Sequence, residues 1–402
     1  MEQYYYPEGW GGAQIPRDIT IDLVRAGHQV RVMCGSELYA PVQSEAAKDP
    51  RQMGVSISRV PPFLLFGRKQ SKILGQVWFC IFATLKIIFS RWPTLFIVQT
   101  NPPLGVVSTS LLAAIMRRPL IVIAQDLYPE VMIAHGMLTK GTLIERLVSL
   151  PFRWAYRRAA YVVSLGPNMS TRLTAKGVSA ERIHQISNWA TGDLGLVRGA
   201  DNLLAAEWGV MGKFVLLYSG NLGVAHDIDT VLRSIAVAKS SLTELRLIIV
   251  GQGGRIAEAK RTAAKLGLEE FVIFKPFVSS SLLPHTLGLA DLALVTLLPG
   301  FEGLVVPSKV LGHMARGVAT LYVGPKSSDV ADLLLESGGG VSVENGEIGG
   351  LAATLIACAT DRPGLNRMSV AARNYYIAHL EQEIGLSHYR DLIASVARKK
   401  AS

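Results

Sequence analysis

Cysteine is scarce in this sequence: the 402 residues include only Cys34, Cys80 and Cys358, and no two of them form a C-x-x-C pair. Scattered cysteines favour neither a disulfide framework nor a zinc site, and they are typical of a protein in a reducing cytoplasm. The first residues also lack the basic and apolar segments of a secretory signal. We therefore expect a cytoplasmic protein without a structural metal.

Long apolar runs are lacking as well. The uncharged segment 73–85 is followed by Lys86, and three prolines interrupt the uncharged segment 92–116. Neither reaches the ~20 consecutive apolar residues of a membrane-spanning helix.

Acidic residues number 31 against 41 basic ones, a net charge of +10. This excess favours an anionic partner, and the absence of a zinc finger or an aromatic RNA-binding signature makes nucleic acid the weakest choice.

Two expected helices combine basic and apolar residues. Ser71–Ser90 is rich in Trp, Phe and Ile between basic flanks, and the helix near Thr142–Ala160 carries three arginines on one face with aromatic residues between them. Such helices can lie among the headgroups of an anionic bilayer, although a domain helix with solvated charges has the same pattern. Because two such helices lie in the same half of the chain, we expect peripheral contact with an anionic membrane surface, at the inner face of the cell membrane.

Short β-branched strands alternate with helices along almost the whole chain, which predicts an α/β fold with parallel, doubly wound sheets. The predicted strands are Val30–Cys34, Val55–Val60, Leu95–Gln99, Leu120–Ala124, Tyr161–Leu165, Phe214–Ser219, Leu245–Val250, Phe271–Lys275, Asp291–Leu297 and Val318–Val323.

A polar, Gly-rich stretch, Asn188–Asp201, separates two α/β halves of similar size. We expect two Rossmann-like domains, 1–195 and 196–370, facing a cleft. Residues 371–402 are predicted to be helical and to pack on an earlier part of the chain. Only Met1–Tyr6 precede a Gly-rich loop, so the first strand is expected to be short or missing.

Ligands of open parallel sheets bind beyond the carboxyl ends of the strands, so the loops after strands are the candidate sites. Gly220 and Asn221 follow one strand, and a helix that starts near Asp227 can present its N-terminus to an anion. Asp227 and Asp229 resemble a D-x-D metal motif, but helix capping explains them better. No metal site is expected there.

Two further loops follow strands of the second half. Gly251 and Gly253 form a tight turn that lacks the full dinucleotide fingerprint, so a nucleotide contact and a purely structural turn are both open. The segment Gly300–Lys309, G-F-E-G-L-V-V-P-S-K, is the strongest candidate. Ser308 can cap the following helix and, with Lys309, form a phosphate site, while Glu302 can accept hydrogen bonds from sugar hydroxyls.

In the first half, the loop Gln125–Glu130 carries two acids that can bind hydroxyls or accept a proton, Asp126 and Glu130. Capping of the next helix is an equally good explanation. We expect Gly11 and Gly12 to face this loop.

Taken together, these motifs resemble glycosyltransferase family 4 of the GT-B fold, including bacterial enzymes of colanic-acid-like exopolysaccharide and O-antigen assembly. The matching motifs, in chain order, are Y-Y-P-E-G-x-G-G, G-H-x-V-x-V, Q-D-L-Y-P-E, Y-S-G-N-L-G-x-A-H-D, G-x-G and E-G-L-V-V-P-S-K. They span nearly the entire chain.

The resemblance implies a nucleotide-sugar donor in the C-terminal domain, a lipid-linked or growing-glycan acceptor in the N-terminal domain, a final helix that crosses back to the first domain, retention at the anomeric carbon and no essential metal or other cofactor. A UDP-linked donor, such as an N-acetylated hexosamine, is expected. The implied catalytic residues are Glu302, Lys309 and Asp126. The implied acceptor-binding residues are Gly11, Gly12 and Glu130. The implied donor-binding residues are Gly220, Asn221, His226, Gly251, Gly253, Gly303, Leu304, Val305, Val306, Pro307 and Ser308.

Two departures from the family pattern concern the donor site. Gly312 stands where the second Glu of a Glu-x7-Glu motif grips the donor ribose, and His226 stands where Lys is common. Because a metal-free transferase must meet the charge of its leaving diphosphate with cations and backbone dipoles, Lys309 becomes the principal cation.

Three other interpretations compete with this one. A nucleotide-sugar epimerase would have the same two halves but no acceptor. An NAD-dependent oxidoreductase would need a fuller fingerprint, and a non-enzymatic membrane scaffold would not depend on Lys309 or Glu302.

Overall fold

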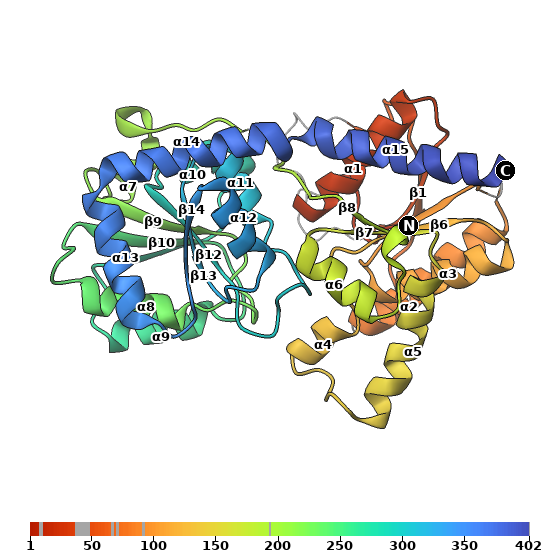
Figure 1. Cartoon of the computed structure of the whole chain (residues 1–402), viewed down its shortest axis with the longest axis horizontal. Helices are drawn as coiled ribbons and strands as arrows, with labels where there is room; N and C mark the ends of the chain where they lie inside the picture. Colours follow the sequence, from red (N-terminus) through yellow and green to blue (C-terminus); the bar gives the residue numbers. More distant parts are fainter. Residues whose placement is uncertain are drawn as a thin grey trace. The chain divides into compact units, whose positions relative to one another are not determined.

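The computed structural model describes residues 1–7, 11–36, 49–65, 68–69, 72–90, 93–192 and 194–401. Contacts divide the chain into two compact units. The first unit comprises Met1–Asn188, Gly303–Val305 and Gln382–Ser402, and the second comprises Trp189–Glu302 and Val306–Glu381 (Figure 1). The predicted boundaries at 195/196 and 370/371 stay predictions, whereas the packing of the chain changes at 188/189 and 381/382.

The second unit is built on a six-stranded parallel sheet with the strand order β11-β10-β9-β12-β13-β14. Its strands are β9 Phe214–Ser219, β10 Leu245–Val250, β11 Val272–Lys275, β12 Leu292–Thr296, β13 Thr320–Val323 and β14 Gly340–Val343. Its helices are α7 Leu203–Glu207, α8 Asp229–Ala238, α9 Ile256–Lys265, α10 Leu283–Gly288, α11 Lys309–Ala315, α12 Asp329–Ser337, α13 Ile348–Thr360 and α14 Arg362–His379, with short 3-10 turns at Gly199–Asp201 and Ser280–Leu282.

Alternate residues of these strands enter two apolar clusters, because successive side chains of a strand point to opposite faces. Leu216 and Leu247 pack on one face with α8, α9 and α13. Leu217 and Ile248 pack on the other with α7 and α10. Burial on both faces explains why these strands read as nearly continuous apolar runs.

The first unit contains a parallel sheet with the order β5-β6-β7-β8, a parallel pair β1-β2 and a short antiparallel pair β3-β4. The strands are β1 Arg31–Gly35, β2 Ser56–Val60, β3 Leu64–Leu65, β4 Arg68–Lys69, β5 Phe96–Gln99, β6 Leu120–Ile123, β7 Tyr161–Ser164 and β8 Ile183–Gln185. The helices are α1 Gly11–Arg25, α2 Lys72–Ile88, α3 Pro103–Ile115, α4 Glu130–Ala134, α5 Leu143–Arg158, α6 Pro167–Ala175 and α15 Gln382–Ala401, with a 3-10 turn at Ala180–Arg182.

The sequence predicts that the first strand is short or missing. No strand is assigned within residues 1–7, yet Met1–Gln3 form backbone hydrogen bonds toward both β1 and β5. Glu2 N donates to Met33 O at 3.1 Å, Gln3 N donates to Asn101 O at 3.2 Å, and the Met1 amino group donates to Ile97 O at 2.6 Å. Three residues thus occupy the position between the β1-β2 pair and the four-stranded sheet.

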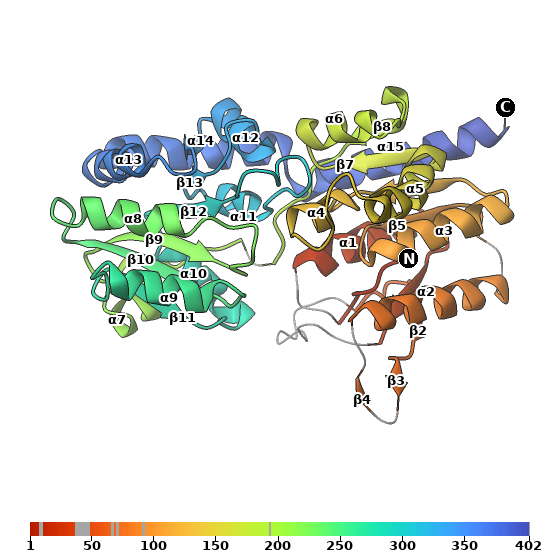
Figure 2. The same cartoon turned by 90° about the horizontal axis from the view of Figure 1, so that it is seen from below.

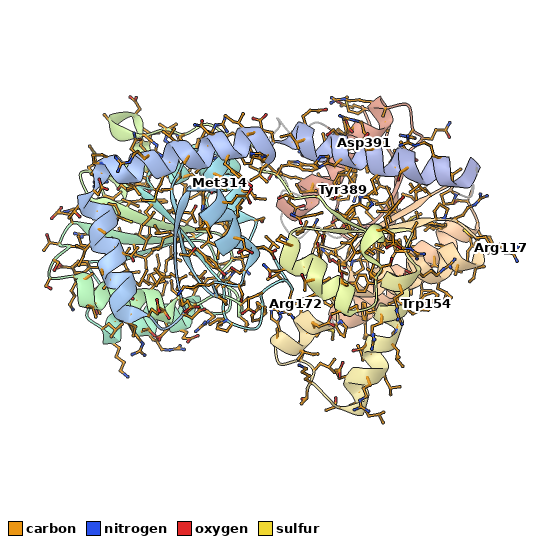
Figure 3. All side chains as sticks on the ribbon, in the orientation of Figure 1. Arg117, Trp154, Arg172, Met314, Tyr389 and Asp391 are labelled. Atoms are coloured by element: carbon orange, nitrogen blue, oxygen red, sulfur yellow. The ribbon has the colours of Figure 1, made fainter. Side chains whose placement is uncertain are left out.

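The predicted C-terminal helical segment forms two helices that belong to different units. Helix α14 packs on α11 of the second unit, and α15 packs on α1 of the first. Arg390 of α15 forms an ion pair with Asp22 of α1 at 2.8 Å. Tyr389 of the same helix is buried (Figure 3). The final helix therefore packs on the first unit, as the family resemblance implied.

Candidate functional site

Lys309, at the start of α11, lies against the end of β9. Its Nζ donates to Tyr218 Oη at 2.6 Å and to the Asn221 carbonyl at 3.3 Å, and it lies 4.1 Å from the centroid of the Tyr218 ring. Tyr218 Oη in turn donates to Asn221 O at 2.7 Å. Gly220 has φ +137°, and a Cβ atom there would lie 2.4 Å from Lys309 Cε. The glycine therefore leaves the space that the lysine side chain occupies. We call Tyr218, Gly220, Asn221, His226 and Lys309 the Lys309 cluster.

The charge of Lys309 has no carboxylate partner at ion-pair distance in the described part of the chain. Burial alone lowers its pKa to about 7, because a cation loses hydration when it is enclosed by protein. A half-buried cation without such a partner is stabilised by an incoming anion, which would raise its pKa again. The Lys309 cluster is therefore the candidate site for an anion.

His226 contributes no second cation to the cluster. Its Nδ1 lies 2.9 Å from Thr296 O, and a carbonyl oxygen can only accept, so Nδ1 carries the proton. Burial, reinforced by the nearby charges of Lys309 and Arg255, lowers the pKa of the ring to about 4. At neutral pH the imidazole is therefore uncharged, and its Nε2 is the nitrogen with the free lone pair.

Arg255 is a basic residue beside this cluster that sequence reasoning missed. It precedes α9, and its Nη1 donates to His226 O at 2.5 Å, while Nε and Nη2 pair with Glu258 at 3.0 and 2.8 Å. Its place directly after Gly251–Gly254 was the available signal. Arg255 thus connects the loop after β10 to the loop after β9.

The two glycines Gly251 and Gly253 let these loops pack together. A Cβ atom on Gly251 would lie 2.0 Å from Gly220 O, and one on Gly253 would lie 2.2 Å from Leu222 O. Leu222 N donates to Gln252 O at 2.7 Å across the same contact. Close backbone approach therefore accounts for both glycines, and their contact with a donor stays a prediction.

The segment Gly300–Lys309 is divided between the two units. Glu302 Oε2 accepts a hydrogen bond from Gly300 N at 2.7 Å, which fixes one carboxylate oxygen within its own loop. The predicted capping role of Ser308 is wrong. Ser308 has helical torsions, φ −63° and ψ −11°, and its side chain forms no capping hydrogen bond with α11. Val306 and Pro307 complete the connection to this helix.

The middle of that segment, Gly303–Val305, belongs to the first unit. Leu304 O accepts from Leu127 N at 2.9 Å, and Val305 forms an isolated antiparallel bridge with Asp126. Gly303 has φ +64°, and a Cβ atom there would lie 2.8 Å from the Asn168 backbone and 3.1 Å from Arg172 Nε. These three residues therefore contact the loop that carries Asp126.

That loop is held by its neighbours. Thr100 Oγ1 accepts from the backbone N–H groups of Gln125 and Asp126 at 3.0 and 3.1 Å. The side-chain amides of Gln125 and Asn188 bond to each other at 2.8 and 3.2 Å. Burial raises the pKa of Asp126 to about 6, against the opposing effect of His135. A carboxylate with this pKa is ionised at neutral pH and can accept a hydrogen bond from a hydroxyl.

The other predicted acceptor residues are placed differently. Glu130, at the start of α4, forms an ion pair with the buried Lys176 at 2.5 Å, and Lys176 also donates to Tyr128 O at 3.1 Å. This pairing gives Glu130 a structural role. Gly11 and Gly12 begin α1. Contact of these three residues with an acceptor stays a prediction.

Asp227 lies directly before Ile228, the N-cap residue of α8, and its carboxylate bonds to the first turn of that helix. Its Oδ1 accepts from Thr230 N at 3.1 Å, and its Oδ2 accepts from Thr230 Oγ1 at 2.7 Å and from Asn345 Nδ2 at 2.8 Å. The sequence predicts Asp227 at the N-cap, whereas Ile228 occupies that position in the structure. Within the described residues, no group of three or more His, Cys, Asp or Glu side chains is arranged to hold a metal ion.

Gly312 lies within α11, one turn after Lys309. A Cβ atom there would meet only Arg316 Nη1, at 3.6 Å, within 4 Å. The helix can therefore hold a side chain at this position, and packing does not require glycine.

Two family models match the chain. The "Glycosyl transferase 4-like domain" matches residues 11–189, and "Glycosyl transferases group 1" matches residues 204–375. Together they cover most of both α/β halves.

This chain is also similar to two relatives and to one solved structure. The chain is 27% identical over 277 residues to WbjE of Pseudomonas aeruginosa, described as a probable glycosyltransferase, covering 67% of this chain and 68% of that protein. It is 26% identical over 337 residues to the "Putative colanic acid biosynthesis glycosyl transferase WcaI" of Escherichia coli K12, covering 78% of this chain and 79% of that protein. The structure of Anabaena HepE with UDP and glucose matches with a TM-score of 0.74 at 17% identity, covering 98% and 99% of the two chains. The structural likeness shows the GT-B fold.

Proposed function

Because this chain belongs to the glycosyltransferase family that these two models describe, we propose that it transfers a sugar from a UDP-sugar to a lipid-linked or growing-glycan acceptor during assembly of a bacterial surface polysaccharide. The observation that carries the donor assignment is Lys309, a half-buried cation without a carboxylate partner in the described chain. The names of WbjE and WcaI support the pathway class. The complexes of HepE with UDP and with UDP-glucose support the nucleotide.

The proposed reaction breaks the bond between the anomeric carbon and the diphosphate oxygen and forms a bond from that carbon to an acceptor oxygen. The negative charge that develops on the diphosphate is met by the Lys309 ammonium and by backbone N–H groups of the loops after β9 and β10, without a metal. Glu302 orients the sugar through its carboxylate. We propose retention of configuration, with the acceptor proton passing to the leaving diphosphate.

Asp126 is proposed to hold the acceptor hydroxyl. Even with its pKa raised to about 6, Asp126 is a carboxylate at neutral pH, the form that accepts a hydrogen bond from a hydroxyl. The acceptor is proposed to be lipid-linked or a growing glycan, so the chain would work as a cytoplasmic protein peripheral at the inner face of the membrane. The net charge of +10 supports an anionic surface as its partner.

The test is a thermal-shift panel of the purified chain with UDP, UDP-glucose, UDP-N-acetylglucosamine and GDP-mannose. We expect a selective shift with UDP compounds that is lost in Lys309→Ala and kept in the control Lys265→Ala, an exposed lysine of α9. Whichever of the two UDP-sugars gives the larger shift indicates whether the donor sugar is a hexose or an N-acetylated hexosamine.

A product assay completes this test. Transfer is expected only when an acceptor is added, and interconversion of free nucleotide-sugars without acceptor would identify an epimerase instead. No shift with any nucleotide, or a UDP shift that survives Lys309→Ala, would count against the proposed donor site.

A further inference from the structure

Three neighbouring helices of the first unit expose rows of apolar side chains. Helix α3 packs against both α2 and α5 (Figure 2). The exposed row of α2 and the turn that follows it occurs at every fourth residue, and the rows of α3 and α5 have similar helical spacing. The exposed residues are Val77, Ile81, Leu85 and Phe89 of the first row, Leu104, Leu111 and Ile115 of the second, and Leu143, Leu147, Leu150 and Trp154 of the third. We call this surface the α2-α3-α5 face.

The exposed apolar side chains of this face lie on neighbouring helices and are not scattered singly over the unit. Leu143 is 72% exposed, Ile115 71% and Phe89 86%. The N-terminal half of α5 extends away from the sheet of its own unit (Figure 1). Exposed apolar side chains grouped in this way mark sites where another molecule or a membrane binds.

The charges on the same helices are almost all positive. Helices α2 and α3 contain no acidic residue, and α5 contains one, Glu145. Its carboxylate bonds to Ser149 Oγ at 2.6 Å and to Gly141 N at 3.3 Å. Arg146 and Arg153 are exposed on α5 and form no ion pair with any described residue. Arg117 lies at the outer end of α3, and Trp154 lies on α5 (Figure 3).

Apolar rows beside unpaired cations fit one class of partner best. A second copy of this chain would bring like charges together on the shared face, which disfavours self-association. A bilayer with anionic headgroups satisfies both features, because the headgroups pair with arginines while the acyl region accepts Leu and Trp side chains. None of the described helices has the length and hydropathy needed to cross a bilayer. The helices are therefore suited to lie in its surface.

We propose that the α2-α3-α5 face docks the first unit on an anionic lipid surface, with the row of α5 as the inserted edge. This inference rests on the proposed function in one respect: a lipid-linked acceptor is the reason for the chain to dock on a membrane. The chain runs from β6 through Asp126 and α4 directly into α5. Docking of α5 therefore keeps the Asp126 loop in a unit that is bound to the acceptor's membrane.

The test is co-sedimentation of the full chain with vesicles of phosphatidylglycerol and phosphatidylethanolamine, compared with vesicles of phosphatidylcholine. We expect binding to the anionic vesicles only. Arg146→Gln/Arg153→Gln is expected to weaken this binding about tenfold or more, because the attraction of two arginines to the anionic headgroups is lost. Leu147→Gln/Leu150→Gln is expected to weaken it similarly, and added salt should weaken the wild type more than the arginine variant.

Matched controls lie on the second unit. Leu335→Gln on α12 removes an exposed leucine, and Arg261→Gln/Lys265→Gln on α9 removes two exposed cations. Both are expected to bind vesicles as the wild type does. Circular dichroism and the UDP thermal shift of the α5 variants should match the wild type, which separates lost docking from lost folding.

Three results would overturn the proposal. These are unchanged binding by both α5 variants, equal binding to phosphatidylcholine, and light scattering that shows a dimer lost in Leu147→Gln/Leu150→Gln, which would identify a second copy as the partner. Vesicle binding needs no nucleotide. A wild-type chain that binds anionic vesicles but shows no nucleotide shift would therefore contradict the proposed donor site and leave the docking face supported.

Discussion

The ammonium group of Lys309 donates hydrogen bonds to Tyr218 and Asn221, and partial burial lowers its pKa to about 7. Below that pH the free protein already holds the cation, whereas above it the lysine must take up a proton when an anion binds. We therefore predict that UDP affinity falls as pH rises from 7 to 9, by up to about tenfold per pH unit. Calorimetric titration across this range measures the slope.

The controls for this prediction are two alanine variants. Lys309→Ala is expected to bind weakly and without that slope, and Lys265→Ala is expected to behave as the wild type. A slope that persists in Lys309→Ala would assign the titration to another group.

Tyr218 is a positioning residue for Lys309, because its hydroxyl accepts from Nζ and donates to Asn221 O. Tyr218→Phe removes that acceptor and destabilises the charged form of the lysine. We predict a loss of UDP affinity of about tenfold at pH 7, typical of a hydrogen bond to a charged group. The same change should shift the pH dependence of binding to lower pH, which calorimetry detects.

Tyr376→Phe is the matched control for this variant. It removes another buried hydroxyl of the second unit, which accepts from Ala190 N at 3.0 Å. We expect it to cost stability without moving the pH dependence. If both variants left that dependence unchanged, Tyr218 would have only a packing role.

At the scale of the secondary-structure elements, the turn between β10 and α9 provides a sharp comparison between adjacent glycines. Gly253 has φ +143° and no room for a Cβ atom, whereas a Cβ atom on Gly254 would meet nothing within 4 Å. We predict that Gly253→Ala lowers the free energy of unfolding by about 2 kcal/mol or more. Gly254→Ala should change it by less than about 0.5 kcal/mol.

Urea unfolding followed by circular dichroism measures both values, and a UDP titration measures the effect on the donor site. Gly253→Ala should also weaken UDP binding, because Leu222 and the Gly220 loop must move. Equal stability of the two variants would show that the approach of Gly253 to Leu222 O is not a constraint.

The buried strands could be predicted because both of their faces are covered. Phe214–Ser219 and Leu245–Val250 are apolar runs of strand length, and their predicted bounds match β9 and β10. The edge strands β8 and β14 were missed. Ile183–Gln185 is short, polar and only partly buried, and Gly340–Val343 begins with glycine and is mostly half-buried. Such segments carry little periodic signal of their own.

From the sequence, a site residue could be predicted only where the chemistry of its own side chain indicates its role. Lys309 follows a strand-end loop, and in the structure it is a half-buried cation without a carboxylate partner among the described residues. The roles of Tyr218 and Arg255 depend on contacts between residues far apart in the chain. The failure of Ser308 to cap α11 depends on its backbone torsions. No local pattern contains that information.

At the scale of the whole molecule, each unit is built from segments that are not continuous in the sequence. Helix α14 completes the second unit, and α15 returns to the first, where Arg390 pairs with Asp22. The segment Gly303–Val305 also belongs to the first unit, although the residues on either side of it belong to the second. The Lys309 cluster lies wholly in the second unit, whereas the α2-α3-α5 face lies wholly in the first.

This division predicts that two ligands protect different parts of one chain from hydrogen exchange. At about 100 times its Kd, UDP stabilises the state that binds it by about 2.7 kcal/mol. Slower exchange is expected in the loops 219–226 and 251–255 and at the start of α11. Anionic vesicles should instead slow exchange in α2, α3 and α5. Mass spectrometry of peptides from the full chain measures both patterns in one preparation.

Each half of this experiment has its own variant and its own way to fail. Lys309→Ala should remove the UDP pattern and keep the vesicle pattern, while Arg146→Gln/Arg153→Gln should do the reverse. UDP protection confined to the first unit would contradict the assignment of the donor to the Lys309 cluster. Vesicle protection confined to the second unit would contradict the docking face. Because each ligand acts on groups that the other does not contact, the loss of one pattern without the other distinguishes a failed donor site from a failed membrane surface.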